Sequence, residues 1–308
     1  MPAPAQPVLA SGAVVDTAPF EIRDATIADL RRCYEIWFRT AVEGSTRVPS
    51  PRRIPMPLHV HELGTGDLIV ALEGSEVVGF GAGVERSGVW FLTDLFVHPA
   101  RQGRGIGHAL LDTLVQRAPR RRATLASPDP RAVALYARAG LTPRWPVYHL
   151  LARPSSRFSV ARGTRVDVAD LDDLAALDRR VCGRDRSVDY DFWIGRVGAT
   201  PLILGHAGRR VGYAFVRPDD DGLWNRDAVV VGPVGVLDAR DAIEAVLAVL
   251  EWVAAQDAPA VRALVPGPSP VLARLLESGF RVRDADTFMA TADGIIDPVR
   301  MLPGPDLL

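Results

Sequence analysis

The sequence contains no lysine, so all of its basic residues are arginines. It has only two cysteines, Cys33 and Cys182, and because they fall in separate helical patterns we expect buried free thiols instead of a disulfide or a metal site. No apolar run approaches the roughly 20 residues of a membrane span, and the start of the chain has neither basic residues nor the apolar core of a signal peptide. We therefore expect a soluble, cytoplasmic protein with a disordered segment at residues 1–18.

The charges are unevenly divided along the chain. Residues 1–157 contain 19 Arg against 14 Asp and Glu, a net charge of +5, whereas residues 158–308 contain 17 against 23, a net charge of −6. A basic first half suits an anionic ligand. No basic stripe is interleaved with aromatic residues, which argues against nucleic acid as a partner.

A glycine-rich segment lies between an apolar strand and a helix. The strand covers residues 91–97, the segment is Gln102–Gly107, and the helix begins near Gly105. The first N–H groups of a helix have no intrahelical partner, so glycines at this point let phosphate oxygens approach them. The segment lacks the Gly-Lys-Ser/Thr ending of a P-loop, and no ribose-binding acid follows at the spacing of a dinucleotide site. By itself it is equally consistent with an ordinary turn.

Two motifs together resemble those of the GNAT superfamily acetyltransferases. Gln102, Gly105 and Gly107 fill the family's pyrophosphate pattern Gln/Arg-x-x-Gly-x-Gly/Ala, and Tyr136 stands four residues before Gly140 in a later helix, as in the family. The resemblance implies that acetyl-CoA is the cosubstrate. The residues implied to bind it are Leu95, Phe96, Val97, Gln102, Gly103, Arg104, Gly105, Ile106, Gly107 and His108.

The same resemblance implies direct transfer of an acetyl group from the thioester to an amine. Tyr136 is the expected acid for the leaving thiolate, although a core aromatic would fit the same helix position. Asp94 is the expected base, with a purely structural role equally open, and Glu85 and Glu43 are alternatives. Strand alternation places Asp94 on the same face as Leu92 and Phe96. No metal is expected.

The order of elements predicts an α/β (α+β) fold with two tandem GNAT-like domains, each a mixed, mostly antiparallel sheet flanked by helices. Residues 19–154 read as strand, helix, three-strand meander, helix, strand, helix and strand. Residues 155–308 repeat this order, and Val168–Leu171 echoes Ile27–Leu30. We expect the end of the chain, Pro298–Leu308, to pack along the sheet or in the groove between the domains.

The second copy lacks the phosphate-binding pattern. Asp238, Asp241 and Ile243 stand where the first copy has Gln102, Gly105 and Gly107, and Leu275 stands opposite Tyr136. Two carboxylates facing a pyrophosphate would repel it. We therefore expect only residues 19–154 to bind acetyl-CoA and catalyse the reaction.

Two further segments carry weaker signals. The prolines between Gly44 and Leu63 predict an irregular segment, and His59 and His61 within it are expected at the surface instead of at a metal. Asp129 stands where the family often has an asparagine that contacts the cofactor, and we interpret it as a helix N-cap.

Three functions are compatible with these patterns. The leading prediction is an N-acetyltransferase that acts on a primary amine of a small molecule, as a monomer or homodimer. The alternatives are a protein or peptide N-acetyltransferase, which would need an open groove, and a non-enzymatic module that senses acetyl-CoA. The sequence does not identify the acceptor.

Overall fold

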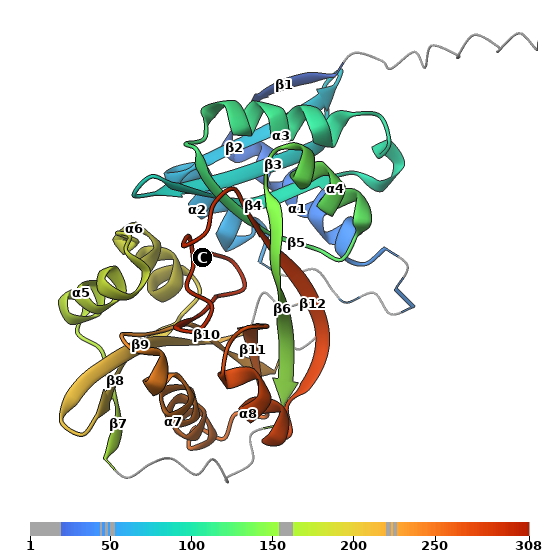
Figure 1. Ribbon diagram of the computed structural model, residues 1–308. Helices are drawn as coiled ribbons and strands as arrows, with labels where there is room; N and C mark the ends of the chain where they lie inside the picture. Colours follow the sequence, from blue (N-terminus) through green and yellow to red (C-terminus); the bar gives the residue numbers. More distant parts are fainter. Residues whose placement is uncertain are drawn as a thin grey trace, which may run out of the picture.

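The computed structural model describes residues 20–43, 45–46, 49, 53–153, 163–219, 223 and 227–307. The predicted disorder of residues 1–18 lies outside these residues. Figure 1 shows two α/β halves that meet at long strands running through the centre of the molecule. Among the described residues no helix has the length and apolar character needed to cross a membrane.

The first half follows the predicted order of elements, with one additional helix, α2. Its strands are β1 (Glu21–Asp24), β2 (Asp67–Glu73), β3 (Glu76–Arg86), β4 (Val89–Val97), β5 (Arg121–Ala126) and β6 (Thr142–Ala152), and its helices are α1 (Leu30–Ala41), α2 (Pro57–Thr65), α3 (Ile106–Arg117) and α4 (Pro130–Arg138).

The second half repeats this order. Its strands are β7 (Thr164–Val168), β8 (Thr200–His206), β9 (Arg209–Pro218), β10 (Ala228–Val236), β11 (Ala260–Pro266), β12 (Arg281–Ala290) and β13 (Met301–Leu302), and its helices are α5 (Leu171–Cys182), α6 (Ser187–Tyr190), the π-helical turn η3 (Asp191–Arg196), α7 (Ala242–Ala254) and α8 (Val271–Glu277).

Helices cover both faces of the sheet in each half. In the first half, Leu30, Cys33 and Ile36 of α1 pack with Phe80 on one face, while α3 packs its leucines on the other face. In the second half, α5, α6 and η3 cover one face, and α7 with α8 covers the other. The predicted fold class, a sheet flanked by helices, is confirmed. Cys33 and Cys182 are both free, and Cys33 is buried as expected.

The two halves exchange strands at the centre of one continuous sheet. The strand order is β1-β2-β3-β4-β5-β12-β6-β11-β10-β9-β8-β7. Strand β12 of the second half therefore lies between β5 and β6, and β6 of the first half pairs antiparallel with β11. The predicted division after residue 154 falls in the connection between β6 and β7. Each half thus receives a neighbouring strand for its own sheet from the other.

A buried ionic network also joins the halves. Asp189 on α6 receives hydrogen bonds from Arg86 at the end of β3 (Nη2 to Oδ1, 2.6 Å), and its Oδ1 lies 2.8 Å from His61 Nε2 on α2. All three side chains are buried. Burial alone would raise the pKa of Asp189, but the contacts with His61 and Arg86 outweigh it and hold that pKa below its ordinary value.

Asp189→Asn is expected to destabilise the protein by about 3–5 kcal/mol at pH 7, because it leaves Arg86 buried without its counter-ion. Since the pKa of Asp189 is depressed in the folded state, its contribution is present above the unfolded pKa and is lost as pH falls through the folded pKa. Urea unfolding at pH 7 and at about pH 2, below the unfolded pKa of an aspartate, measures both effects. Asp185→Asn, which removes an exposed partner of Arg179, is the control and should cost less than about 1 kcal/mol. Equal losses in both variants would contradict the assignment.

The end of the chain returns to the sheet, as the sequence predicts. Met301 and Leu302 of β13 pair antiparallel with Gly235 and Val234 of β10. Leu307 is buried in a core cluster that also contains Met56 and Leu58 of the first half. Figure 1 places this end between the two halves.

Candidate functional site

Strand β4 carries a bulge and then separates from β5. Its pairing with β3 shifts by one residue between Leu92 and Asp94, so Thr93 is the extra residue. On its other side β4 pairs in parallel with β5 only over Val89–Leu92. The edge of β4 after Leu92 is therefore free of β5, which leaves backbone groups available to a ligand.

The bulge changes which face each side chain occupies. Leu92 packs against α3, as do Leu95 and Val97 beyond the bulge, whereas Phe96 packs on the α1 face. Asp94 also points to the helices on that face, where it lies beside His59 of α2. Leu92 was expected on the same face of the strand as Asp94 and Phe96, and this was wrong. The extra residue Thr93 shifts the alternation of side chains, so Leu92 lies on the opposite face.

The glycine-rich segment forms an open entry to α3. Gly103 and Gly105 have φ of +75° and +82°, and a Cβ at either position would meet no atom within 4 Å. Glycine adopts such φ values without steric cost. Gly107 is in the first turn of α3, and its Cβ would lie 3.6 Å from Val97. The segment thus presents helix N–H groups with no side chain in front of them.

Paired charges border this entry. Glu73 at the end of β2 holds both Arg101 (Nε to Oε2, 2.8 Å) and Arg104 (Nη1 to Oε1, 2.7 Å). On the opposite side, Asp129 accepts a hydrogen bond from the backbone N–H of Arg131 at 2.8 Å. The predicted N-cap role of Asp129 is therefore confirmed. Hydrogen bonds from Arg131 keep the pKa of Asp129 below its ordinary value, so it is ionised at neutral pH.

A cleft of about 400 Å³ joins the free edge of β4 to the glycine-rich segment. Arg104 does not line it and points to Glu73 instead. Tyr136 of α4 lines the cleft and is almost buried, and burial together with the charges of Asp94 and Asp129 raises its pKa, so the phenol is protonated at neutral pH. The other predicted cofactor residues line the cleft, namely Leu95, Phe96, Val97, Gln102, Gly103, Gly105, Ile106, Gly107 and His108.

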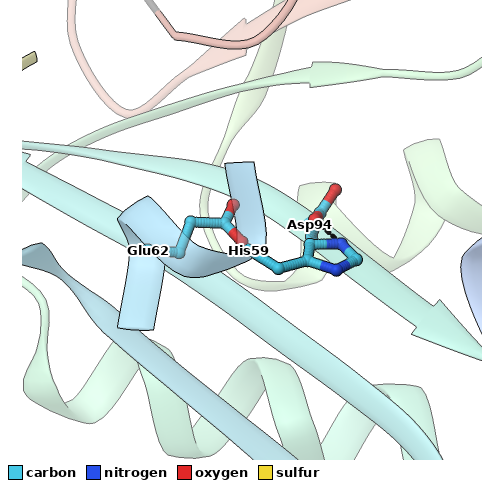
Figure 2. A group of neighbouring side chains, drawn as sticks. All are labelled: His59, Glu62 and Asp94. Atoms are coloured by element: carbon cyan, nitrogen blue, oxygen red, sulfur yellow. Dashed lines mark ion pairs between the residues drawn. The ribbon is translucent and has the colours of Figure 1, made fainter. Parts of the chain in front are cut away.

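Asp94 belongs to a buried cluster that Figure 2 shows from the side of α2. His59 Nε2 lies 3.1 Å from Asp94 Oδ2, and Glu62 stands one turn further along the same helix. His59 and Glu62 have no exposed surface, and Asp94 is 6% exposed. Burial and the charge of Asp94 raise the pKa of Glu62 well above its ordinary value. The raised pKa of Glu62 favours its protonated form beside Asp94.

His59 and Glu62 were not predicted as site residues, and two expectations for their segment were wrong. Residues Pro57–Thr65 form a helix in which Pro57 occupies the first turn, where its missing N–H costs nothing. His59 and His61 are buried, not exposed, and they serve different partners, Asp94 and Asp189. The spacing of His59 and Glu62, which places both on one helix face, was the available signal.

The composition of this cluster would also permit metal ligation. The ligand atoms of His59, Glu62 and Asp94 all lie within 4.8 Å of one another. Imidazole and carboxylate ligands suit zinc and similar divalent ions. The alternative bases from the sequence analysis lie elsewhere: Glu85 is exposed and accepts a hydrogen bond from Gly88 N–H in a turn, and Glu43 is exposed at the end of α1.

The equivalent segment of the second half has a different backbone. Asp241, which aligns with Gly105, has φ of −87° and not a left-handed conformation. Asp238 accepts a hydrogen bond from Arg240 N–H and pairs with the Arg240 side chain. The entry to α7 is therefore occupied by side chains of its own segment.

These features coincide with a known domain family. Residues 30–141 match the model of the acetyltransferase (GNAT) family. This part of the chain is similar to a GNAT acetyltransferase domain. The match spans β4, the glycine-rich segment and Tyr136, which are the parts that form the cleft. None of the curated proteins matches this sequence.

Solved structures with the same fold extend over nearly the whole chain. A candidate acetyltransferase from Pyrococcus horikoshii has a TM-score of 0.71 at 17% identity, over 94% of this chain and 96% of that one. A tandem GNAT protein from the clavulanic acid biosynthesis pathway has a TM-score of 0.60 at 19% identity, over 88% and 98% of the two chains. A fungal glucosamine N-acetyltransferase region has a TM-score of 0.66 at 14% identity, over 90% of this chain and 38% of that protein. At these identities the likeness concerns the fold.

Proposed function

We propose that this protein is an acetyl-CoA-dependent N-acetyltransferase that transfers the acetyl group to a primary amine of a small molecule. The observation that carries the proposal is the single cleft in which a free strand edge, an open helix entry and a protonated tyrosine meet. These are the groups needed for a pantetheine arm, a pyrophosphate and a leaving thiolate. The GNAT domain of the first half supports an acyltransferase.

The cleft suits acetyl-CoA in shape and charge. The free backbone edge at Leu95–Val97 would bind the amide groups of pantetheine as a neighbouring strand does. The N–H groups around Gly105 would bind the pyrophosphate, because no side chain stands between them and the ligand. Arg101 and Arg131 line the same cleft and add positive charge for the remaining phosphate.

The reaction needs a base before the thioester is attacked, because an ammonium has no free electron pair. Asp94 is the proposed base: its carboxylate lies on the strand that would bind the thioester, and it would take one ammonium proton directly or through water. His59, 3.1 Å from its carboxylate, would orient Asp94 and share the proton. Glu62 is protonated and so is a poorer candidate for this step.

The amine nitrogen then attacks the carbonyl carbon, and the C–S bond breaks. Backbone N–H groups near Phe96 would stabilise the charge that develops on the carbonyl oxygen. The protonated phenol of Tyr136, which lines the cleft, would give its proton to the leaving thiolate. The nitrogen then gives its second proton to the phenolate of Tyr136, directly or through water, so that the acetylated amine and free CoA are the products and the phenol is restored.

The enclosure around Asp94 supports a small acceptor over a peptide. His59 and Glu62 are fully buried, and Leu58 of the same helix packs in a core cluster with Leu307 from the end of the chain. A peptide acceptor would need an open groove on this side. The experiment that tests the function is a screen of small amines with acetyl-CoA, in which release of CoA is followed by a thiol reagent and the product is identified by mass spectrometry.

Tyr136→Phe is expected to lower kcat for the best amine by about 100-fold or more, because the ring is kept while the proton donor is lost. Binding of acetyl-CoA by calorimetry should stay within about threefold of the parent, since the phenol is not a phosphate contact. Tyr148→Phe, on β6 outside the lining of the cleft, is the control. Unchanged turnover in Tyr136→Phe would favour another acid, and binding without turnover of any amine would favour a sensor of acetyl-CoA.

A further inference from the structure

The second half has a gap between strands like the one that forms the cleft of the first half. Strand β10 pairs in parallel with β11 only over Ala228–Val231, just as β4 pairs with β5 over Val89–Leu92. Both β4 and β10 are nine residues long. Aligning them end to end places Val234 and Gly235 at the positions of Leu95 and Phe96, which line the cleft of the first half.

This second gap is filled by the end of the chain. Met301 and Leu302 pair antiparallel with β10 at Gly235 and Val234, and the N–H of Val236 donates to the carbonyl of Arg300 at 3.0 Å. Strand β13 also lies close to β11, on the other side of the gap. The backbone edge that the first half offers to a ligand is thus occupied in the second half by residues 300–302.

The fit continues beyond β13. A Cβ on Gly232 would lie 2.7 Å from the carbonyl oxygen of Pro303, and one on Gly304 would lie 3.2 Å from Pro233. Glycines at these two positions let the tail and β10 approach closely. Pro303 and Gly304 are buried.

The tail then reaches the first half. Asp306 forms an ion pair with Arg217 of β9, a side chain that is only 3% exposed. Leu307 is 1% exposed and belongs to the cluster that contains Met56, Leu58 and Phe91 of the first half. The charge of Asp306 also acts on Glu62, which lies beside Asp94. The last residues of the chain are therefore close to the acceptor side of the proposed active site.

We propose that residues 300–307 are a built-in strand ligand, which has replaced acetyl-CoA in the second gap and forms one wall of the acceptor site of the first half. The pairing of the tail with β10 rests on strand geometry alone, whereas its replacement of acetyl-CoA rests on the proposed function. The second part, the acceptor wall, rests on the proposed function. Two consequences follow: the chain binds one equivalent of acetyl-CoA, and the tail behaves as a peptide with its own affinity for the folded protein.

The experiment releases the tail from a protein that has already folded. A protease site is inserted between Asp293 and Gly294, both of which are exposed, and the full chain is cleaved after purification. We expect the tail to remain bound through gel filtration and to exchange slowly with a labelled synthetic peptide of residues 294–308. A scrambled peptide should not be taken up. Release of the tail from a remainder that keeps its circular dichroism and its acetyl-CoA binding would overturn the proposal.

Two variants separate docking of the tail from general stability. Leu307→Asp should cause loss of the tail after cleavage, because it puts a charge into a buried cluster. Leu276→Asp makes the same change on α8, where the side chain is 41% exposed, and should retain the tail. If both variants lose the tail after cleavage, its retention in the parent protein reflects overall stability and the proposal fails.

Two further readings distinguish this proposal from the proposed function. Calorimetry on the intact protein should give one acetyl-CoA equivalent, and a second equivalent would contradict replacement of the ligand by the tail. The cleaved Leu307→Asp variant, which should have lost its tail, is then assayed with the best amine of the screen. We expect its KM for the amine to rise at least tenfold, while its Kd for acetyl-CoA stays within threefold of the parent value. An unchanged KM would overturn the acceptor wall. If the protein retains its tail but acetylates no amine, the tail is still a built-in strand ligand, but the proposed acetyltransferase function is wrong.

Discussion

Asp94→Asn is expected to lower kcat by about 10²–10⁴-fold, the range that a positioned general base contributes. The amide has nearly the size of the carboxylate but cannot take a proton from the ammonium. It can still meet His59, which lies 3.1 Å away, so the cluster should stay packed. Affinity for acetyl-CoA should change little, because Asp94 lies on the α1 face of β4, away from the glycine-rich segment.

The measurement is steady-state kinetics with the best amine, together with calorimetric binding of acetyl-CoA. Glu85→Gln is the matched control, because it neutralises an exposed acid on the neighbouring strand and should keep kcat within about twofold. Treatment of the parent protein with a chelator tests the prediction that the reaction needs no metal at His59, Glu62 and Asp94. If Asp94→Asn turns over normally, the structural role that the sequence left open for Asp94 is correct.

Gly105→Glu is expected to weaken acetyl-CoA binding by about 10²–10³-fold and to abolish measurable transfer. The new carboxylate would stand in the open entry of α3, where a pyrophosphate charge at about 4 Å is repelled by up to about 4 kcal/mol. The residue would also have to adopt φ near +82°, which costs a side-chain-bearing residue roughly 1–2 kcal/mol. Calorimetry with acetyl-CoA measures the loss directly.

Gly208→Glu separates these two effects. Gly208 lies in the turn between β8 and β9 with φ of +76°, and a Cβ there would also meet no atom within 4 Å. The control therefore carries the same backbone strain and the same charge at a site remote from the cleft. Similar stability losses in both variants, with binding lost only in Gly105→Glu, are the expected outcome. Full binding by Gly105→Glu would refute the phosphate site.

The proposed acid and the proposed base come from different parts of the fold. Tyr136 lies on α4 behind the cleft, and Asp94 lies on β4 with its partner His59 on α2. Their charges are coupled, because Asp94 raises the pKa of Tyr136 and of Glu62. One carboxylate thus favours the protonated state of both neighbours. Loss of its charge in Asp94→Asn should therefore lower both of these pKa values.

Much of the first half could be predicted because its signals are local. The strand predicted over residues 91–97 lies within β4, since it is a run of mostly apolar residues before a turn. The glycine-rich entry to α3 followed from residue types whose backbone preferences act within a few positions. The helix start at Asp129 followed from the same kind of reasoning.

Only the tertiary structure decided which of these elements meet. The bulge at Thr93 depends on pairing with β3. Beyond it, Asp94 lies on the face of the sheet that α2 covers, beside His59 and Glu62. The exchange of β6 and β12 and the return of residues 300–307 to β10 join positions more than 60 residues apart. A periodic pattern specifies which face of an element is buried, but the partner of that face is chosen by packing across the whole chain. The sequence by itself thus determined the glycine-rich motif and the repeated order of elements, while the fold decided the surroundings of Asp94, the proposed base, and the place of the tail.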